Sequence, residues 1–260
     1  RLGMMKWLPD QNIYLSWGKD SYKGHIVSVK FPEQDTTVFV DSSLFYLNGK
    51  KLSIYSFNLD ESKSKLLLLT KRKKIWRHSF YGEYFVLDLP TKTVFPITKN
   101  NDDLRNVKLS PDGAKVAYVR KDNNLYIFDL NRKKEKRLTK NGSSTYLNGH
   151  FGWVYEEEFG SYDAYRWSPN SKYIAYWQVD QSKVPVFRMF DELGLYPKVQ
   201  EIHYPKAGQT NPTMSIFVVD VNRGRSKKMD IKDSNDKYYP WMKWGNNESL
   251  IIMRMNRLQN

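Results

Sequence analysis

The chain has 260 residues, of which 40% are hydrophobic and 15% aromatic, and its formal net charge is +14. This content of aliphatic and aromatic side chains excludes a disordered chain, because their burial can offset the entropy lost when the backbone is ordered. The absence of cysteine excludes disulfides, thiolate catalysis and cysteine-based zinc sites, and no apolar run approaches the roughly 18 residues of a membrane helix, so we expect no membrane span.

Short apolar runs separated by turn residues follow one another along the whole chain. Runs of Val, Ile, Leu, Tyr, Phe and Trp recur between clusters of Gly, Asn, Asp and Pro, at the spacing of successive strands. Apolar residues at helical spacing are nearly absent over long stretches. The sequence therefore predicts an all-β protein.

A turn-and-strand motif occurs more than once. The segments LSPDGAKVAYV (109–119) and WSPNSKYIAYW (167–177) match position by position, and weaker copies lie at 7–17 and 244–254. Proline fixes φ and Asp or Asn accepts hydrogen bonds within the turn, so each copy predicts a tight turn followed by a strand.

A second repeated element ends in an apolar residue, an aspartate and another aliphatic residue. It is found as YFVLDL (84–89), LYIFDL (125–130) and IFVVDV (216–221), each followed by a polar turn and another strand. The two elements together predict four-stranded antiparallel sheets, and their repetition predicts a β-propeller with about five blades and a long insertion between Asp180 and Pro212. A β-sandwich with coincidentally similar turns is the alternative.

The segment WRHSF (Trp76–Phe80) places an arginine and a histidine beside aromatic residues at the start of a strand-like run. The planar guanidinium of Arg77 can pair with a carboxylate or bind a carbonyl group. We interpret His78 as a strand histidine held by hydrogen bonds, because the sequence contains no nucleophile elbow that would make it catalytic.

The segment WVYEEEF (Trp153–Phe159) places three consecutive glutamates in a basic chain. Side chains alternate along a strand, so the three cannot share one face of it, whereas a helical turn or a bulge brings neighbours closer together. Carboxylates held together repel, and a cation among them relieves the repulsion. The segment is therefore either an exposed acidic turn or a site for a metal ion, a basic side chain or the ammonium group of a ligand.

Basic residues cluster at Lys71–Lys74, Asn131–Arg137 and Asn222–Lys228, and the last two clusters directly follow strand-like runs. A nucleic-acid site would gather such charges on one face beside aromatic side chains. We interpret these clusters as solvated turns and strand ends, and expect no nucleic-acid partner.

Several of these segments resemble one known family. GWVYEEEF (152–159), the segments 164–187 and 196–221, which include YPKAGQTNPT, and WRHSF are similar to the N-terminal propeller of the dipeptidyl peptidase IV family of prolyl oligopeptidase-like serine peptidases. RMNRLQN (254–260) resembles a later strand of that propeller. The resemblance extends from about Ile75 to the C-terminus, whereas the preceding residues match only in general propeller character.

The resemblance implies roles for individual residues. Glu157 and Glu158 correspond to the glutamates that hold the free α-ammonium group of a peptide substrate. Arg77 corresponds to the arginine that contacts the carbonyl group of the second substrate residue and orients the glutamates, and Ser161 to a serine that lines the same site. The family commonly has a phenylalanine two positions after the last glutamate, where this chain has Gly160, which puts the aromatic wall there in doubt.

The resemblance also implies that the propeller and the catalytic residues belong to different domains of a larger protein. Family propellers have eight blades, so residues 1–260 are expected to form part of one. The family's catalytic serine, aspartate and histidine lie in a C-terminal α/β-hydrolase domain, so we expect no catalytic residue, metal or cofactor in this chain, and no activity of the chain alone. Glu156 receives no role.

The implied function is substrate recognition and gating for release of N-terminal X-Pro or X-Ala dipeptides. The implied partners are therefore such peptides and the hydrolase domain, with a homo-oligomer as a further possibility, and the implied location is a bacterial periplasm or envelope. Two alternatives stay open, namely the propeller of a prolyl tripeptidyl peptidase and a stand-alone propeller that acts as an interaction scaffold.

Overall fold

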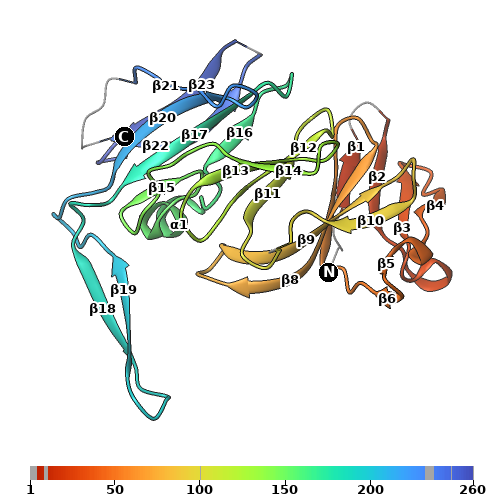
Figure 1. The fold of residues 1–260 in the computed structure, drawn as a ribbon, viewed down its shortest axis with the longest axis horizontal. Coiled ribbons are helices and arrows are strands. Elements are labelled where there is room, and N and C mark those ends of the chain that lie inside the picture. The colour runs from red at the N-terminus through yellow and green to blue at the C-terminus, as the bar shows by residue number, and fades with distance from the viewer. Residues whose placement is uncertain (1–4, 9–10, 100, 232–236, 247, 260) are drawn as a thin grey trace.

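The fold is built almost entirely from antiparallel β-sheets (Figure 1). The computed structural model describes residues 5–8, 11–99, 101–231, 237–246 and 248–259. Four sheets of at least four strands follow one another along the chain, and the part that the structure describes contains a single α-helix, α1 (Trp153–Phe159). The prediction of an all-β protein with four-stranded antiparallel sheets is confirmed.

The bounds of the strands are as follows. The first sheet contains β1 (Met5–Leu8), β2 (Ile13–Trp17), β3 (Ile26–Lys30) and β4 (Thr36–Val40). The second contains β7 (Ser56–Leu59), β8 (Lys65–Lys74), β9 (Phe80–Asp88) and β10 (Thr93–Pro96). The third contains β11 (Arg105–Leu109), β12 (Lys115–Val119), β13 (Leu125–Asp129) and β14 (Lys134–Arg137). The fourth contains β15 (Tyr146–Asn148), β16 (Tyr165–Trp167), β17 (Tyr173–Asp180), β20 (Thr213–Asp220) and β21 (Ser226–Lys228). Three hairpins pair β5 (Tyr46–Leu47) with β6 (Lys50–Lys51), β18 (Val186–Asp191) with β19 (Lys198–His203), and β22 (Lys237–Trp244) with β23 (Leu250–Asn256).

The repeated turn motif joins β11 to β12 in the third sheet and β16 to β17 in the fourth sheet. In the third sheet, Ser110 Oγ accepts a hydrogen bond from the Lys115 amide at 2.9 Å, at the turn between β11 and β12. In the fourth, Ser168 Oγ accepts one from the Tyr173 amide, also at 2.9 Å, between β16 and β17. The predicted correspondence between the two segments is therefore confirmed. Part of the weaker copies, at residues 9–10 and 247, lies outside the described residues.

The second sheet contains a copy of this turn that the sequence motif missed. Asp60 takes the place of the serine, and its carboxylate accepts hydrogen bonds from the Ser64 amide at 2.9 Å and the Lys65 amide at 2.6 Å. The segment lacks the Ser-Pro pair, so the match to the other copies is weak at the level of sequence. A carboxylate and a hydroxyl thus close the same turn because both accept hydrogen bonds from backbone amides.

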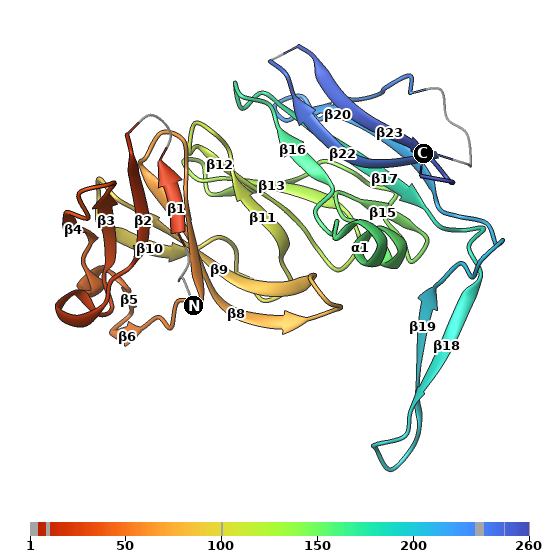
Figure 2. The ribbon, with the colours of Figure 1, turned by 180° about the vertical axis from the view of Figure 1, so that it is seen from behind.

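Consecutive sheets pack against one another and form an arc along the long axis of the molecule (Figures 1 and 2). Each interface is a cluster of buried aliphatic and aromatic side chains. One cluster joins the first and second sheets, one the second and third, and one the third and fourth, while a fourth cluster contains α1, β17, β20 and β22. Four sheets and the β22–β23 ribbon agree with the predicted count of about five blades.

The first strand of the fourth sheet is interrupted by the helix. β15 pairs with one half of β17, through Asn148 and Gln178, and β16 pairs with the other half, through Tyr165 and Tyr176. Between them the chain leaves the sheet to form α1, and a bridge between His150 and Asp163 closes the base of this excursion. Because the sheet holds both ends of the excursion, the position of α1 relative to the sheets is fixed.

The predicted insertion between Asp180 and Pro212 contains the β18–β19 hairpin, which projects away from the sheets (Figures 1 and 2). All six residues of β18 are exposed. Within the described residues, no helix has both the length and the apolar character needed to cross a membrane.

Candidate functional site

The helix α1 is anchored on one side by buried aromatic residues. Tyr155 is fully buried, its ring stacks on Phe151 with centroids 4.7 Å apart, and its hydroxyl accepts a hydrogen bond from the Tyr239 amide at 3.0 Å. The helix ends at Gly160, whose φ of +61° is the left-handed conformation that glycine adopts at helix ends. Of the two geometries that the sequence left open for this segment, the structure contains the helical turn.

The helix gives the three glutamates different degrees of burial. Successive residues of a helix are rotated by about 100°, so three neighbours point in different directions. Glu156 is fully buried, Glu157 is partly buried and Glu158 is exposed. Each carboxylate therefore has different surroundings.

Arg77 forms an ion pair with Glu157. It lies in the turn of residues 75–79 between β8 and β9, and its Nη2 is 3.2 Å from Glu157 Oε2. The Arg77 side chain is 70% exposed and that of Glu157 is 20% exposed. The ion pair joins the second sheet to the helix of the fourth sheet, and pairing with a carboxylate is one of the two roles that the sequence left open for this arginine. Most of the guanidinium remains accessible to a ligand.

Glu158, which follows Glu157 on the helix, lines a cavity of about 600 Å³. The wall contains an aromatic cluster in which the rings of Trp153 and Tyr204 lie 4.1 Å apart and those of Phe187 and Tyr204 lie 5.7 Å apart. No described residue forms a hydrogen bond or ion pair with the Glu158 carboxylate. An open carboxylate beside aromatic walls is suited to a ligand that combines a positive charge with an apolar part.

Ser161 lies just beyond the helix, and its hydroxyl is close to the carbonyl oxygens of Phe159 at 3.4 Å and Pro240 at 3.5 Å. Phe159 packs against Tyr238 with ring centroids 5.1 Å apart. An aromatic side chain is therefore present next to Gly160, the position at which the sequence put the aromatic wall in doubt.

The interpretation of His78 as a strand residue held by hydrogen bonds is wrong. His78 lies in the turn before β9, where its side chain is exposed and its ring stacks on Tyr162 with centroids 6.3 Å apart. The hydrogen bond that holds this residue is donated by its backbone amide.

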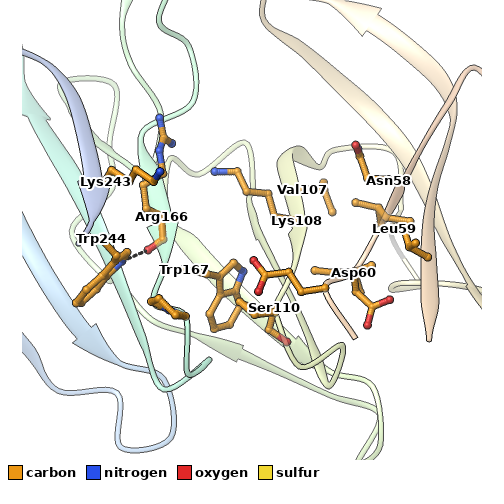
Figure 3. A pocket seen from close by; sticks show the side chains of 15 residues that line it. Asn58, Leu59, Asp60, Val107, Lys108, Ser110, Arg166, Trp167, Lys243 and Trp244 are labelled. Carbon is orange, nitrogen blue, oxygen red and sulfur yellow. Dashed lines mark hydrogen bonds between the residues drawn. The ribbon is translucent and has the colours of Figure 1, made fainter. Parts of the chain in front are cut away.

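A second cavity, of about 480 Å³, is lined by residues of the second, third and fourth sheets and of β22 (Figure 3). Lys108 and Arg166 share the Asp163 carboxylate there, at 2.6 Å and 3.1 Å. Burial lowers the pKa of Lys108 to about 8, although the charge of Asp163 opposes the shift. In the described part of the chain, no group of three or more His, Asp or Glu side chains could hold a metal ion.

Sequence reasoning missed two features of the site. The first is the aromatic cavity beside Glu158, to which Tyr204 contributes from the insertion whose tertiary position the sequence does not indicate. The second is Arg105 in β11, which is only 3% exposed and acts electrostatically on Glu156. Nothing in the local pattern LRNVKLS distinguishes this arginine from an exposed strand residue.

The chain is similar to known proteins over nearly its whole length. Residues 60–260 match the family model described as the dipeptidyl peptidase IV (DPP IV) N-terminal region. The chain is 31% identical to dipeptidyl-aminopeptidase B of Aspergillus niger over 97% of its length, and 32% identical to dipeptidyl aminopeptidase B of Saccharomyces cerevisiae over 85%. It spans 31% and 28% of the lengths of these two relatives.

A solved structure has the same fold. The crystal structure of Porphyromonas gingivalis dipeptidyl peptidase 4 matches 99% of this chain with a TM-score of 0.88 and 30% sequence identity, and the match covers 37% of that protein.

Proposed function

Because the chain belongs to the family of dipeptidyl peptidase IV N-terminal regions, we propose that it is the substrate-recognising propeller region of a serine exopeptidase. In this proposal the whole protein releases dipeptides from peptide N-termini whose second residue is proline or alanine. The observation that carries the proposal is the ion pair between Arg77 and Glu157. Glu158, the next residue of α1, lines a cavity and has an exposed side chain.

The charge of the site favours a cation. Glu157 and Glu158 carry two negative charges and Arg77 one positive charge, so the three side chains have a net charge of about −1. An α-ammonium group neutralises this charge and donates up to three hydrogen bonds to carboxylate oxygens. A peptide whose N-terminus is blocked lacks both the charge and these donors.

Arg77 supplies the second contact in the proposal. Its guanidinium uses one nitrogen for Glu157 and has further donors in the same plane. These donors are suited to a backbone carbonyl oxygen of the bound peptide. Ser161 lines the site beyond the helix end. An ammonium and a carbonyl bound together fix the direction in which a peptide leaves the site.

Recognition of the ammonium gives exopeptidase specificity. The carboxylates lie at a fixed position on α1, so the peptide bond at one fixed distance from the bound N-terminus is presented for cleavage. The nucleophile belongs, in this proposal, to an α/β-hydrolase domain outside these residues. The propeller binds, orients and admits the substrate, and the hydrolase domain cleaves it.

The test uses the full-length protein with Glu157→Gln plus Glu158→Gln, and Glu248→Gln as the matched control, because Glu248 is exposed in a turn of the β22–β23 hairpin. Each lost charge-assisted hydrogen bond weakens binding by about 1.5–3 kcal/mol, or roughly tenfold to a hundredfold in KM for Gly-Pro or Ala-Pro substrates. Hydrolysis with unchanged KM in the double variant would overturn the proposal. Release of tripeptides by the wild-type protein would assign the site to a tripeptidyl peptidase.

A further inference from the structure

The carboxylate of Glu156 is buried and binds a backbone segment. Glu156 has no exposed surface, and its Oε1 accepts hydrogen bonds from the amides of His78 at 2.7 Å and Ser79 at 2.8 Å. The two partners lie 78 and 77 residues away in the sequence and belong to the turn between β8 and β9. One carboxylate oxygen thus connects α1 to the second sheet.

The segment that Glu156 binds is the turn that carries Arg77. This turn of residues 75–79 is closed by a hydrogen bond from the Ile75 amide to the Ser79 carbonyl at 2.9 Å. Glu156 holds the backbone directly after Arg77, while Glu157 contacts the guanidinium itself at 3.2 Å. Two successive glutamates of one helix therefore contact the backbone that follows the arginine and the guanidinium group of its side chain.

A buried cation lies near the buried carboxylate. Arg105 of β11 is 3% exposed, and burial lowers the pKa of its guanidinium while Tyr81 and Glu156 oppose that shift. Among the described residues, Arg105 Nε and Nη2 and Glu156 Oε2 have no hydrogen-bond partner. A buried carboxylate without a countercharge is unfavourable, and Arg105 supplies a positive charge in this interior.

We propose that Glu156 is a positioning residue, which holds the turn of residues 75–79 so that the Arg77 guanidinium is placed opposite Glu157. This inference rests on the proposed function, because the consequence of that placement is the binding of the peptide ammonium and carbonyl groups. Glu156 itself contacts no substrate, since its carboxylate is fully buried. A purely structural role would lower stability and leave the affinity for peptides unchanged.

Two variants of the full-length protein separate these roles. Glu156→Ala removes the acceptor of both amides, whereas Glu156→Gln keeps an oxygen in the same place and removes the charge. We expect Glu156→Ala to speed hydrogen exchange in residues 75–79 by about tenfold or more, with β12 unchanged as an internal control. We expect the same variant to raise KM for Gly-Pro substrates by about tenfold, and Glu156→Gln to restore most of both effects.

A folded Glu156→Ala protein in which either the exchange in residues 75–79 or KM is unchanged would overturn the inference. If Glu156→Ala does not fold, Glu156→Asp decides instead, because its shorter side chain keeps the charge but moves the acceptor away from both amides. Faster exchange together with a raised KM is then expected, and normal values of either would overturn the inference. The proposed function is tested separately by Glu157→Gln plus Glu158→Gln, which leaves the Glu156 hydrogen bonds intact.

Discussion

The end of the helix that carries the three glutamates gives a quantitative prediction. Gly160 has a φ of +61°, and a Cβ atom added there meets no other atom within 4 Å. Gly149 has a φ of +75°, but a Cβ atom there would lie 3.0 Å from Val119 Cγ2 and 3.2 Å from Leu125 Cδ1. Alanine at Gly160 therefore meets only a backbone penalty, whereas alanine at Gly149 meets the same penalty and a crowded core.

The two costs can be estimated separately. The left-handed conformation costs an L-residue roughly 1–2 kcal/mol. Alanine also lowers the conformational entropy of the unfolded chain, which stabilises the folded protein by about 0.4–1 kcal/mol and offsets part of that cost. Gly160→Ala should therefore lower the free energy of unfolding by about 1 kcal/mol. Overpacking adds roughly 1–3 kcal/mol at Gly149, so Gly149→Ala should cost about 2–4 kcal/mol.

Urea unfolding of both variants measures these differences directly. Gly160→Asn serves as a control, because asparagine tolerates the left-handed conformation better than alanine and should cost less than Gly160→Ala. Equal costs for Gly160→Ala and Gly149→Ala would refute the reasoning, since only the surroundings of the added Cβ atom differ. A Gly160→Ala variant as stable as the wild type would refute the backbone penalty.

Two further predictions concern buried groups near the site. Burial, followed by the charge of Arg105, lowers the pKa of His150 well below its usual value of 6.5. The unfolded chain therefore binds more protons below pH 6.5, so stability is full above that pH and falls as the pH decreases, by at most about 1.4 kcal/mol per pH unit. Melting temperatures at pH 7.5 and 5.0 measure this loss, and an equal loss in His150→Gln would contradict the assignment. Tyr155→Phe leaves the buried Tyr239 amide without its acceptor and should cost about 1–3 kcal/mol in urea unfolding. Tyr176→Phe, which loses only a 3.5 Å contact to a serine hydroxyl, should cost less, and the reverse order would contradict the prediction.

The sequence predicts the sheets well because their turns are encoded locally. Ser110 and Ser168 bind the amides of their own turns, so the repeat is visible without tertiary information. The same turn at Asp60 was missed, because another acceptor replaces the serine and the proline is absent. Turn chemistry is thus recognised only where its commonest residues are present.

The site is less predictable because its geometry depends on contacts between distant segments. The pairing of Arg77 with a glutamate could be anticipated from charge, but the burial of Glu156 could not. Its partners are two amides 78 and 77 residues away, and the charge near it is that of Arg105 in another sheet. A helix of seven residues within a strand-rich region also gives too short a pattern to identify its faces.

The central claim is that Glu157 and Glu158 bind a peptide ammonium group. Its most direct test is the ratio of kcat/KM for a peptide with a free N-terminus to that for the same peptide acetylated, measured in the full-length protein. We predict a ratio of about a hundredfold or more in the wild-type protein, which falls close to one in Glu157→Gln plus Glu158→Gln. A double variant that keeps the wild-type ratio would contradict the claim.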